Sequence, residues 1–98
     1  MRPALVRVTA GDAICGIEWF EARPFALGWA LPGESFPAGD ASCVPPPAVL
    51  DVDLPSNFRG EVSIWIEAWN GDRGILAAGE GRGVLREGGA FAVDVVIR

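Results

Sequence analysis

Hydrophobic residues recur at every second position over most of the chain, and short clusters of Gly, Pro, Asn and Asp separate these runs. A period of two places alternate side chains on opposite faces of an extended strand, whereas a helix needs apolar residues at every third or fourth position. The pattern therefore predicts a series of short β-strands joined by turns. The expected strands cover residues 4–10, 13–22, 25–31, 48–54, 61–70, 75–79 and 90–97.

The clearest strand is predicted over residues 61–70. Its even-numbered residues from Val62 to Ala68 are apolar, and its odd-numbered residues are Glu, Ser or Trp. Asn70 and Gly71 follow this pattern directly, and both residue types tolerate the positive φ that primed hairpin turns require. We expect a β-hairpin at this point.

A hydrophobic core is expected where this strand faces two others. Residues 48–54 and 90–97 show the same alternation, with apolar residues on one face. The predicted centre of the core consists of Val62, Ile64 and Ile66 on one side and Leu50, Phe91, Val93 and Val95 on the other.

Three segments are less regular. Residues 13–22 carry apolar side chains on both faces, so we expect a strand that is partly covered on each side and ends before Arg23. Residues 32–47 hold five prolines and predict a long irregular connection. Residues 79–83 predict a turn or bulge that interrupts one strand, which resumes at Val84. A phosphate-binding loop is excluded there, because the residues that follow cannot sustain the helix that such a loop needs.

About seven short strands, with turns every 8–12 residues, are typical of a two-sheet antiparallel sandwich. Over 98 residues this arithmetic predicts one all-β domain that spans residues 1–98. An open barrel is the alternative arrangement of the same strands.

The second half of the chain also resembles known modules. Its three most regular segments are Leu50–Pro55, Val62–Asp72 and Gly88–Val95. From about residue 48 to residue 98 the chain is similar to the later strands of immunoglobulin-like and fibronectin III-like sandwiches in bacterial envelope proteins. The resemblance implies a structural or interaction module in the cell envelope or outside the cell. The sequence departs from antibody domains, because Cys15 and Cys43 lie too close together and the chain has no Tyr.

The chain lacks residue types on which most common catalytic mechanisms depend. The chain has no His and no Lys, and all eight basic residues are Arg. Without these residues there is no imidazole base, no Ser-His or Cys-His pair, no ordinary zinc site and no Schiff-base lysine. We therefore expect no enzyme activity and no cofactor. Asp51 and Asp53 share an outward face, and their carboxylates supply the oxygen ligands that Ca²⁺ prefers. Their spacing matches no calcium-binding loop, however, and favours a strand face exposed to solvent.

The net charge of −5 bears on partners. Binding to nucleic acid depends on a basic surface that releases counterions, so an acidic chain is not expected to bind it. The apolar runs are also far shorter than the roughly 20 residues that span a bilayer as a helix. A protein partner or self-association is the expected form of interaction.

Cys15 and Cys43 are the only cysteines. In an oxidising compartment they would pair as a disulfide, and the alternative is two unrelated buried thiols. A catalytic thiol is not expected, because no His is present to form a thiolate and the Cys-x-x-Cys spacing is absent.

Trp65 and Trp69 share one strand face about 13 Å apart, with Glu67 between them. This arrangement resembles the aromatic platforms on which sugar rings stack in sandwich-type carbohydrate-binding modules. The competing interpretation is that this face is covered, either by residues 32–47 or by a partner subunit.

Three functions are therefore open at the level of sequence. The first is a non-catalytic module for adhesion, spacing or assembly. The second is a carbohydrate-binding module that uses Trp65, Glu67 and Trp69. The third is a small viral or host accessory protein that acts by binding another protein.

Overall fold

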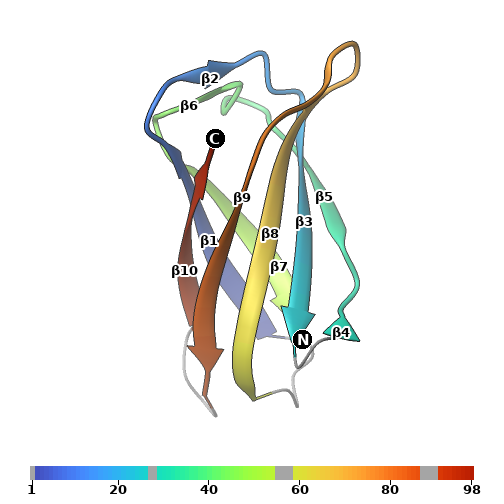
Figure 1. Ribbon diagram of the computed structural model, residues 1–98, viewed down its shortest axis with the longest axis vertical. Coiled ribbons are helices and arrows are strands. Elements are labelled where there is room, and N and C mark those ends of the chain that lie inside the picture. Colours follow the sequence, from blue (N-terminus) through green and yellow to red (C-terminus); the bar gives the residue numbers. More distant parts are fainter. Residues whose placement is uncertain (1, 27–28, 55–58, 87–90) are drawn as a thin grey trace.

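Every regular element in the described part of the chain is a β-strand (Figure 1). The computed structural model describes residues 2–26, 29–54, 59–86 and 91–98, with the backbone alone at residues 2 and 3. The strands are β1 (Arg2–Ala10), β2 (Ile14–Cys15), β3 (Trp19–Ala26), β4 (Trp29–Ala30), β5 (Glu34–Pro37), β6 (Cys43–Val44), β7 (Ala48–Leu54), β8 (Gly60–Asn70), β9 (Gly74–Leu85) and β10 (Phe91–Ile97). The prediction of an all-β chain is confirmed.

Two larger sheets face each other in Figure 1. The three-stranded sheet has the order β10-β1-β7, and the five-stranded sheet has the order β4-β3-β8-β9, with β5 also paired to β3. The short β2-β6 pair lies at one end of the molecule. β1 runs parallel to β10, so the expectation of a purely antiparallel sandwich is wrong for this pair. The other pairs among the described strands are antiparallel.

The core lies between the two sheets and contains the predicted residues. Val62, Ile64 and Ile66 of β8 have no exposed surface, and the inward residues of β7 and β10 are buried as well. Each of these strands buries every second side chain. The alternate side chains are exposed on β7 and β10, whereas on β8 most of them are half-buried. The strict alternation in the sequence therefore identified the faces of these three strands correctly.

The predicted interruption at residues 79–83 is wrong, because β9 is continuous from Gly74 to Leu85. The glycines at alternate positions in this segment face β10 and leave room for its backbone. A Cβ built on Gly81 would lie 2.5 Å from the carbonyl oxygen of Asp94, and one on Gly79 would overlap the carbonyl of Val96. Glycine therefore serves here to bring two strands together, which is a recognised use of this residue within a strand.

At this corner the two sheets meet. Ala78 of β9 and Arg98, just after β10, exchange two backbone hydrogen bonds with N···O distances of 3.3 and 3.0 Å. The edges of β9 and β10 therefore shelter each other.

The single strand expected over residues 13–22 is also wrong. Gly16 has a φ of +83°, which is a left-handed conformation that breaks the strand between β2 and β3. β3 then runs through Pro24, although a proline lacks the N–H that a central strand needs. The Leu31 N–H donates to the Pro24 carbonyl at 2.9 Å, so Pro24 directs its backbone polar groups to the side away from β8. On that side Pro24 lies between the residues that pair with β5 and those that pair with β4, where a missing N–H is tolerated.

The ends of the segment 25–31 pair with each other, so it is not one strand. Phe25 pairs with Ala30 and Ala26 pairs with Trp29, while residues 27 and 28 lie outside the described residues. Residues 32–47 are likewise more ordered than expected, because they contain β5 and β6. Alternation of large and small residues does not distinguish one strand from a short hairpin, which explains the first of these errors.

The predicted hairpin after Asn70 is confirmed, with a different turn. Asn70 pairs with Gly74, and the left-handed residue is Gly74, with a φ of +82°, and not Gly71. The Asn70 side-chain oxygen accepts the backbone N–H groups of Asp72 and Arg73 at 2.9 and 3.1 Å. The asparagine thus fixes a three-residue loop through its side chain.

The close approach of β9 and β10 gives a stability prediction. We expect Gly81→Ala to lower the free energy of unfolding by about 1–3 kcal/mol, because the added methyl group meets the Asp94 carbonyl. The control is Gly11→Ala, since no atom lies within 4 Å of a Cβ at Gly11. Denaturant melts should show the control unchanged or slightly more stable. Equal stability of the two variants would contradict the packing described here.

Candidate functional site

The outward side of the five-stranded sheet carries a cluster of aromatic and charged side chains. We call this cluster the Trp face. It consists of Trp19, Glu21 and Arg23 on β3 and Trp65, Glu67 and Trp69 on β8. The alternation of each strand directs these residues away from the core, and the register places Trp19 opposite Trp69, Glu21 opposite Glu67 and Arg23 opposite Trp65.

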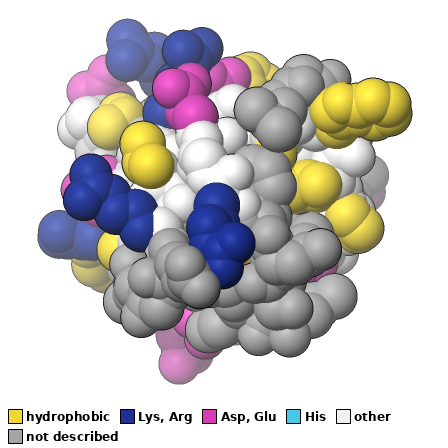
Figure 2. Space-filling view, turned by 90° about the horizontal axis from the view of Figure 1, so that it is seen from below, with side chains coloured by type: hydrophobic (Ala, Val, Ile, Leu, Met, Phe, Trp, Pro, Cys, Tyr) yellow, Lys and Arg dark blue, Asp and Glu magenta, His cyan; other side chains and the backbone are white. Residues whose placement is uncertain are grey.

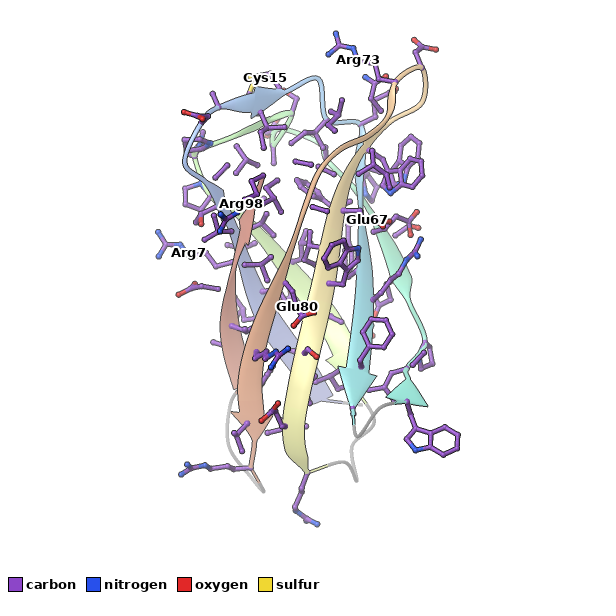
Figure 3. The ribbon with its side chains drawn as sticks, viewed as in Figure 1. Arg7, Cys15, Glu67, Arg73, Glu80 and Arg98 are labelled. Atoms are coloured by element: carbon purple, nitrogen blue, oxygen red, sulfur yellow. A yellow bond between two sulfur atoms is a disulfide. The ribbon has the colours of Figure 1, made fainter. Side chains whose placement is uncertain are left out.

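Glu67 lies at the centre of the Trp face, with 6% of its surface exposed. One carboxylate oxygen accepts the indole N–H of Trp65 at 3.0 Å, and the other accepts the indole N–H of Trp69 at 3.0 Å. The Arg23 guanidinium completes the set, with its Nη2 atom 3.2 Å from Glu67 Oε1. A buried carboxylate is stable only with such partners, so the glutamate and the two indoles fix one another's positions. Figure 3 shows Glu67 on the side of the molecule opposite Arg7 of β1.

Glu21 repeats this arrangement on the neighbouring strand. It accepts the Trp19 indole N–H at 3.0 Å and the Ser35 hydroxyl of β5 at 2.9 Å. Both strands therefore use a Trp and a Glu two residues apart, whose side chains share one face. The contact with Ser35 ties the edge strand β5 to the Trp face.

Trp19 and Trp69 stack on each other. Their ring centroids are 5.7 Å apart and the ring planes differ by 9°. One face of each ring is therefore occupied by its neighbour, while the two N–H groups are bound to different carboxylates. Hydrogen bonds and stacking thus fix the orientation of both rings, and Trp69 does not offer both of its faces to a ligand.

The structure brings the three predicted binding residues together. Trp65, Glu67 and Trp69 share one face, and both indoles donate to Glu67, which is buried between them instead of standing exposed. Their role in binding stays a prediction. Residues 32–47 do not cross the face as one interpretation proposed, because β5 lies beside β3 and extends the sheet.

Sequence reasoning missed Trp19, Glu21 and Arg23 as members of this cluster. The signal was present, since Trp19 and Glu21 repeat the spacing of Trp65 and Glu67. This signal was not used, because a strand that ends before Arg23 does not reveal the pairing between the strand of Trp19 and the strand of Trp65.

Comparison of the chain with family models, curated proteins and solved structures gives no match. The functional argument therefore rests on the geometry of this chain. Within the described residues, no helix is long and apolar enough to cross a membrane.

Two further features lie away from the Trp face. On β9, Glu80 accepts a hydrogen bond from the exposed Arg82 at 2.9 Å and so raises the pKa of Arg82. A largely apolar pocket lies near the end of β10. It is lined by Gly11, Asp12, Ile14, Leu76, Val96, Ile97 and Arg98.

Cys15 and Cys43 form a disulfide that joins β2 to β6 (Figure 3). They are directly paired across the two strands, next to the pair Ile14 and Val44. The bond therefore fastens the short two-stranded sheet that closes one end of the core, where Val44 is fully buried. The possible disulfide between the two cysteines is therefore present, and the alternative of two unrelated buried thiols is wrong.

The anchoring role of Glu67 can be tested by removing its side chain. We expect Glu67→Ala to lower the free energy of unfolding by about 3 kcal/mol, because two indole N–H groups and a guanidinium lose their acceptor. Glu61→Ala is the control, since Glu61 is exposed on the same side of β8 and should change stability by less than about 0.5 kcal/mol. A small loss in the Glu67 variant would show that the carboxylate does not organise the Trp face.

The disulfide gives a second stability prediction. Replacing both cysteines by Ser opens a loop whose ends are 28 residues apart, and this should cost about 3.6 kcal/mol on the chain-entropy account. Thermal melts with and without reductant make the measurement, and the double variant should melt identically in both. A wild-type chain that melts at the same temperature when reduced would refute this prediction.

Proposed function

We propose that the chain is a non-catalytic β-sandwich module of the immunoglobulin-like or fibronectin III-like kind, working in adhesion, spacing or assembly. The observation that carries this proposal is the Trp face, whose indoles are held by two carboxylates and by stacking, while β5 lies beside it in the same sheet. A cluster of three tryptophans on the outward face of a sheet is best explained by a partner that docks there.

The carboxylates of the Trp face support a role in binding over one in catalysis. A general acid or base must reach the reacting atoms of its substrate. Glu67 is buried among three donors, and Glu21 is held by an indole and a hydroxyl. These groups serve to hold the tryptophans in place.

The surface offered to a partner combines aromatic rings with a cation. The three tryptophans are half-buried, and the Arg23 side chain is 52% exposed. Trp and Arg are the residues most often responsible for binding energy at protein interfaces. The acidic net charge favours a partner with Arg or Lys at its rim.

A second apolar area adjoins the lower end of the same sheet. Trp29 of β4 is 76% exposed, and Phe25 at the end of β3 is also exposed. Figure 2 shows hydrophobic side chains on the side where β4 lies, with most of the visible Arg side chains elsewhere. The docking surface therefore extends from the Trp face toward β4.

We further propose that the protein works in the cell envelope or outside the cell. Cys15 is exposed, and disulfides near the surface persist mainly in oxidising compartments. This placement agrees with the resemblance to envelope modules in residues 48–98.

The experiment adds a bulky side chain beside the Trp face and leaves unchanged the residues that hold the tryptophans. Ser63 lies on the outward side of β8, two residues before Trp65, and Ser63→Arg adds bulk there. Thr9→Arg makes the same change of charge on the outward side of β1 and is the matched control. Both variants and the wild type are immobilised and exposed to an envelope extract of the source organism. We expect Ser63→Arg to capture at least about tenfold less of the wild type's partner, and Thr9→Arg to capture as much as the wild type. Equal capture by all three proteins, or none by the wild type, would contradict docking through this face.

Carbohydrate binding is the second candidate. It is favoured by the partly exposed Trp65, which Glu67 holds in one orientation as a stacking surface requires. A glycan array separates the two functions. Specific binding to a glycan that is lost in both Trp65→Ala and Trp69→Ala would favour the sugar-binding function over protein docking.

A further inference from the structure

β7 is the longest strand edge that the described residues leave without a neighbouring strand. It ends the three-stranded sheet and has seven residues. β9 is longer but lies against β10, and β4 and β5 have two and four residues. An exposed edge offers backbone N–H and C=O groups to an additional strand.

The direction of the backbone groups on this edge follows from one hydrogen bond. The backbone N–H of Asp53 donates to the Glu34 carboxylate of β5 at 2.8 Å, so it points away from β1. Alternate residues of an extended strand direct their polar groups to the same side. The N–H and C=O groups of Val49 and Asp51 therefore also point to the open edge, whereas the Asp53 N–H is already bound by Glu34.

The side chains beside these groups have a distinct chemistry. Val49 is 58% exposed, and Asp51 and Asp53 are exposed on the same outward face. With Glu34 they place three carboxylates along one end of the edge. A second copy of the chain is a poor occupant, because antiparallel pairing of two β7 strands about Asp51 would set like charges opposite each other.

We propose that the edge of β7 binds an extended basic segment of a partner protein as an added strand. The segment carries Lys or Arg at two alternate positions, opposite Asp51 and Asp53, and an apolar residue at the next alternate position, opposite Val49. Its backbone bonds to Val49 and Asp51. The proposal rests on the proposed function in taking the chain to be an interaction module, but it uses a surface separate from the Trp face.

The test uses a synthetic seven-residue peptide with blocked ends. It has Lys at two alternate positions, Val at the third and Thr between them, and a control peptide has Glu in place of Lys. Binding is followed by the backbone amide shifts of the protein in NMR titrations. We expect the Lys peptide to shift amides within residues 48–54 and to bind more weakly as salt is raised, and the Glu peptide not to bind.

Two variants separate the backbone from the charges. Asp51→Pro removes an N–H that points to the open edge and leaves the pairing with β1 intact, so binding should fall at least about tenfold. The double variant Asp51→Asn and Asp53→Asn keeps the N–H groups and should weaken binding between about 2- and 30-fold, as expected for two opposite-charge pairs across strands. If the proline variant fails to fold, the double variant and the salt dependence still decide.

Several results would overturn the proposal. These are no binding of the Lys peptide at millimolar concentration, shifts confined to other strands, or unchanged binding in a folded Asp51→Pro variant. Ser63→Arg should bind the peptide as the wild type does. Peptide binding by NMR therefore tests the β7 edge alone, and capture from the envelope extract tests docking at the Trp face, so failure of one proposal is distinguishable from failure of the other.

Discussion

The outward side of the five-stranded sheet is organised by the need to satisfy one buried carboxylate. Glu67 is 6% exposed in the middle of β8, and a charge in that position is destabilising unless donors surround it. Two indoles and one guanidinium supply those donors. Because the donors come from both β3 and β8, the carboxylate also ties these central strands together on the side away from the core. β8 is therefore packed on both faces, by the apolar core on one side and by the Trp face on the other.

A second constraint acts where the two sheets meet. The glycines of β9 have no side chains, so the carbonyl groups of β10 come directly against its backbone. Side chains at these positions would hold the sheets apart at this corner. Because β9 and β10 cover each other's edges, the edge of the three-stranded sheet that stays open is β7, at the opposite corner of the molecule. The glycine segment thus helps to determine which edge of the molecule is available to another strand.

Much of the fold could be predicted from alternation alone, and the reasons for the errors are physical. β7, β8 and β10 each have one apolar and one more polar face, so their inward residues were assigned correctly. Alternation does not show where a chain turns back, so the β3–β4 hairpin was taken for one strand. Alternation also does not show why a strand contains glycine. Gly81 is needed because the Asp94 carbonyl, distant in sequence, lies against its backbone. The continuation of β3 through Pro24 depends on a gap between β5 and β4, which only the tertiary structure reveals.

The candidate site was only half accessible to sequence reasoning for a similar reason. Trp65, Glu67 and Trp69 lie on one strand, and their common face follows from a period of two. Trp19 and Glu21 join them through the pairing of β3 with β8, more than 40 residues apart in the chain. Register of this kind is set by the packing of whole strands, and a local motif does not encode it.

The two proposed surfaces differ in the interaction on which they depend. The Trp face presents aromatic rings and a partly exposed guanidinium that the fold has already fixed, so a partner would bind it with little ordering of side chains. The β7 edge presents backbone groups flanked by carboxylates, which recognise an extended chain and select its charge. The acidic residues on this edge would also disfavour pairing between copies of the protein. On many edge strands Lys has this effect, but this chain has no Lys. The carboxylates that would disfavour self-association at this edge are thus the same groups that define the basic partner proposed for it.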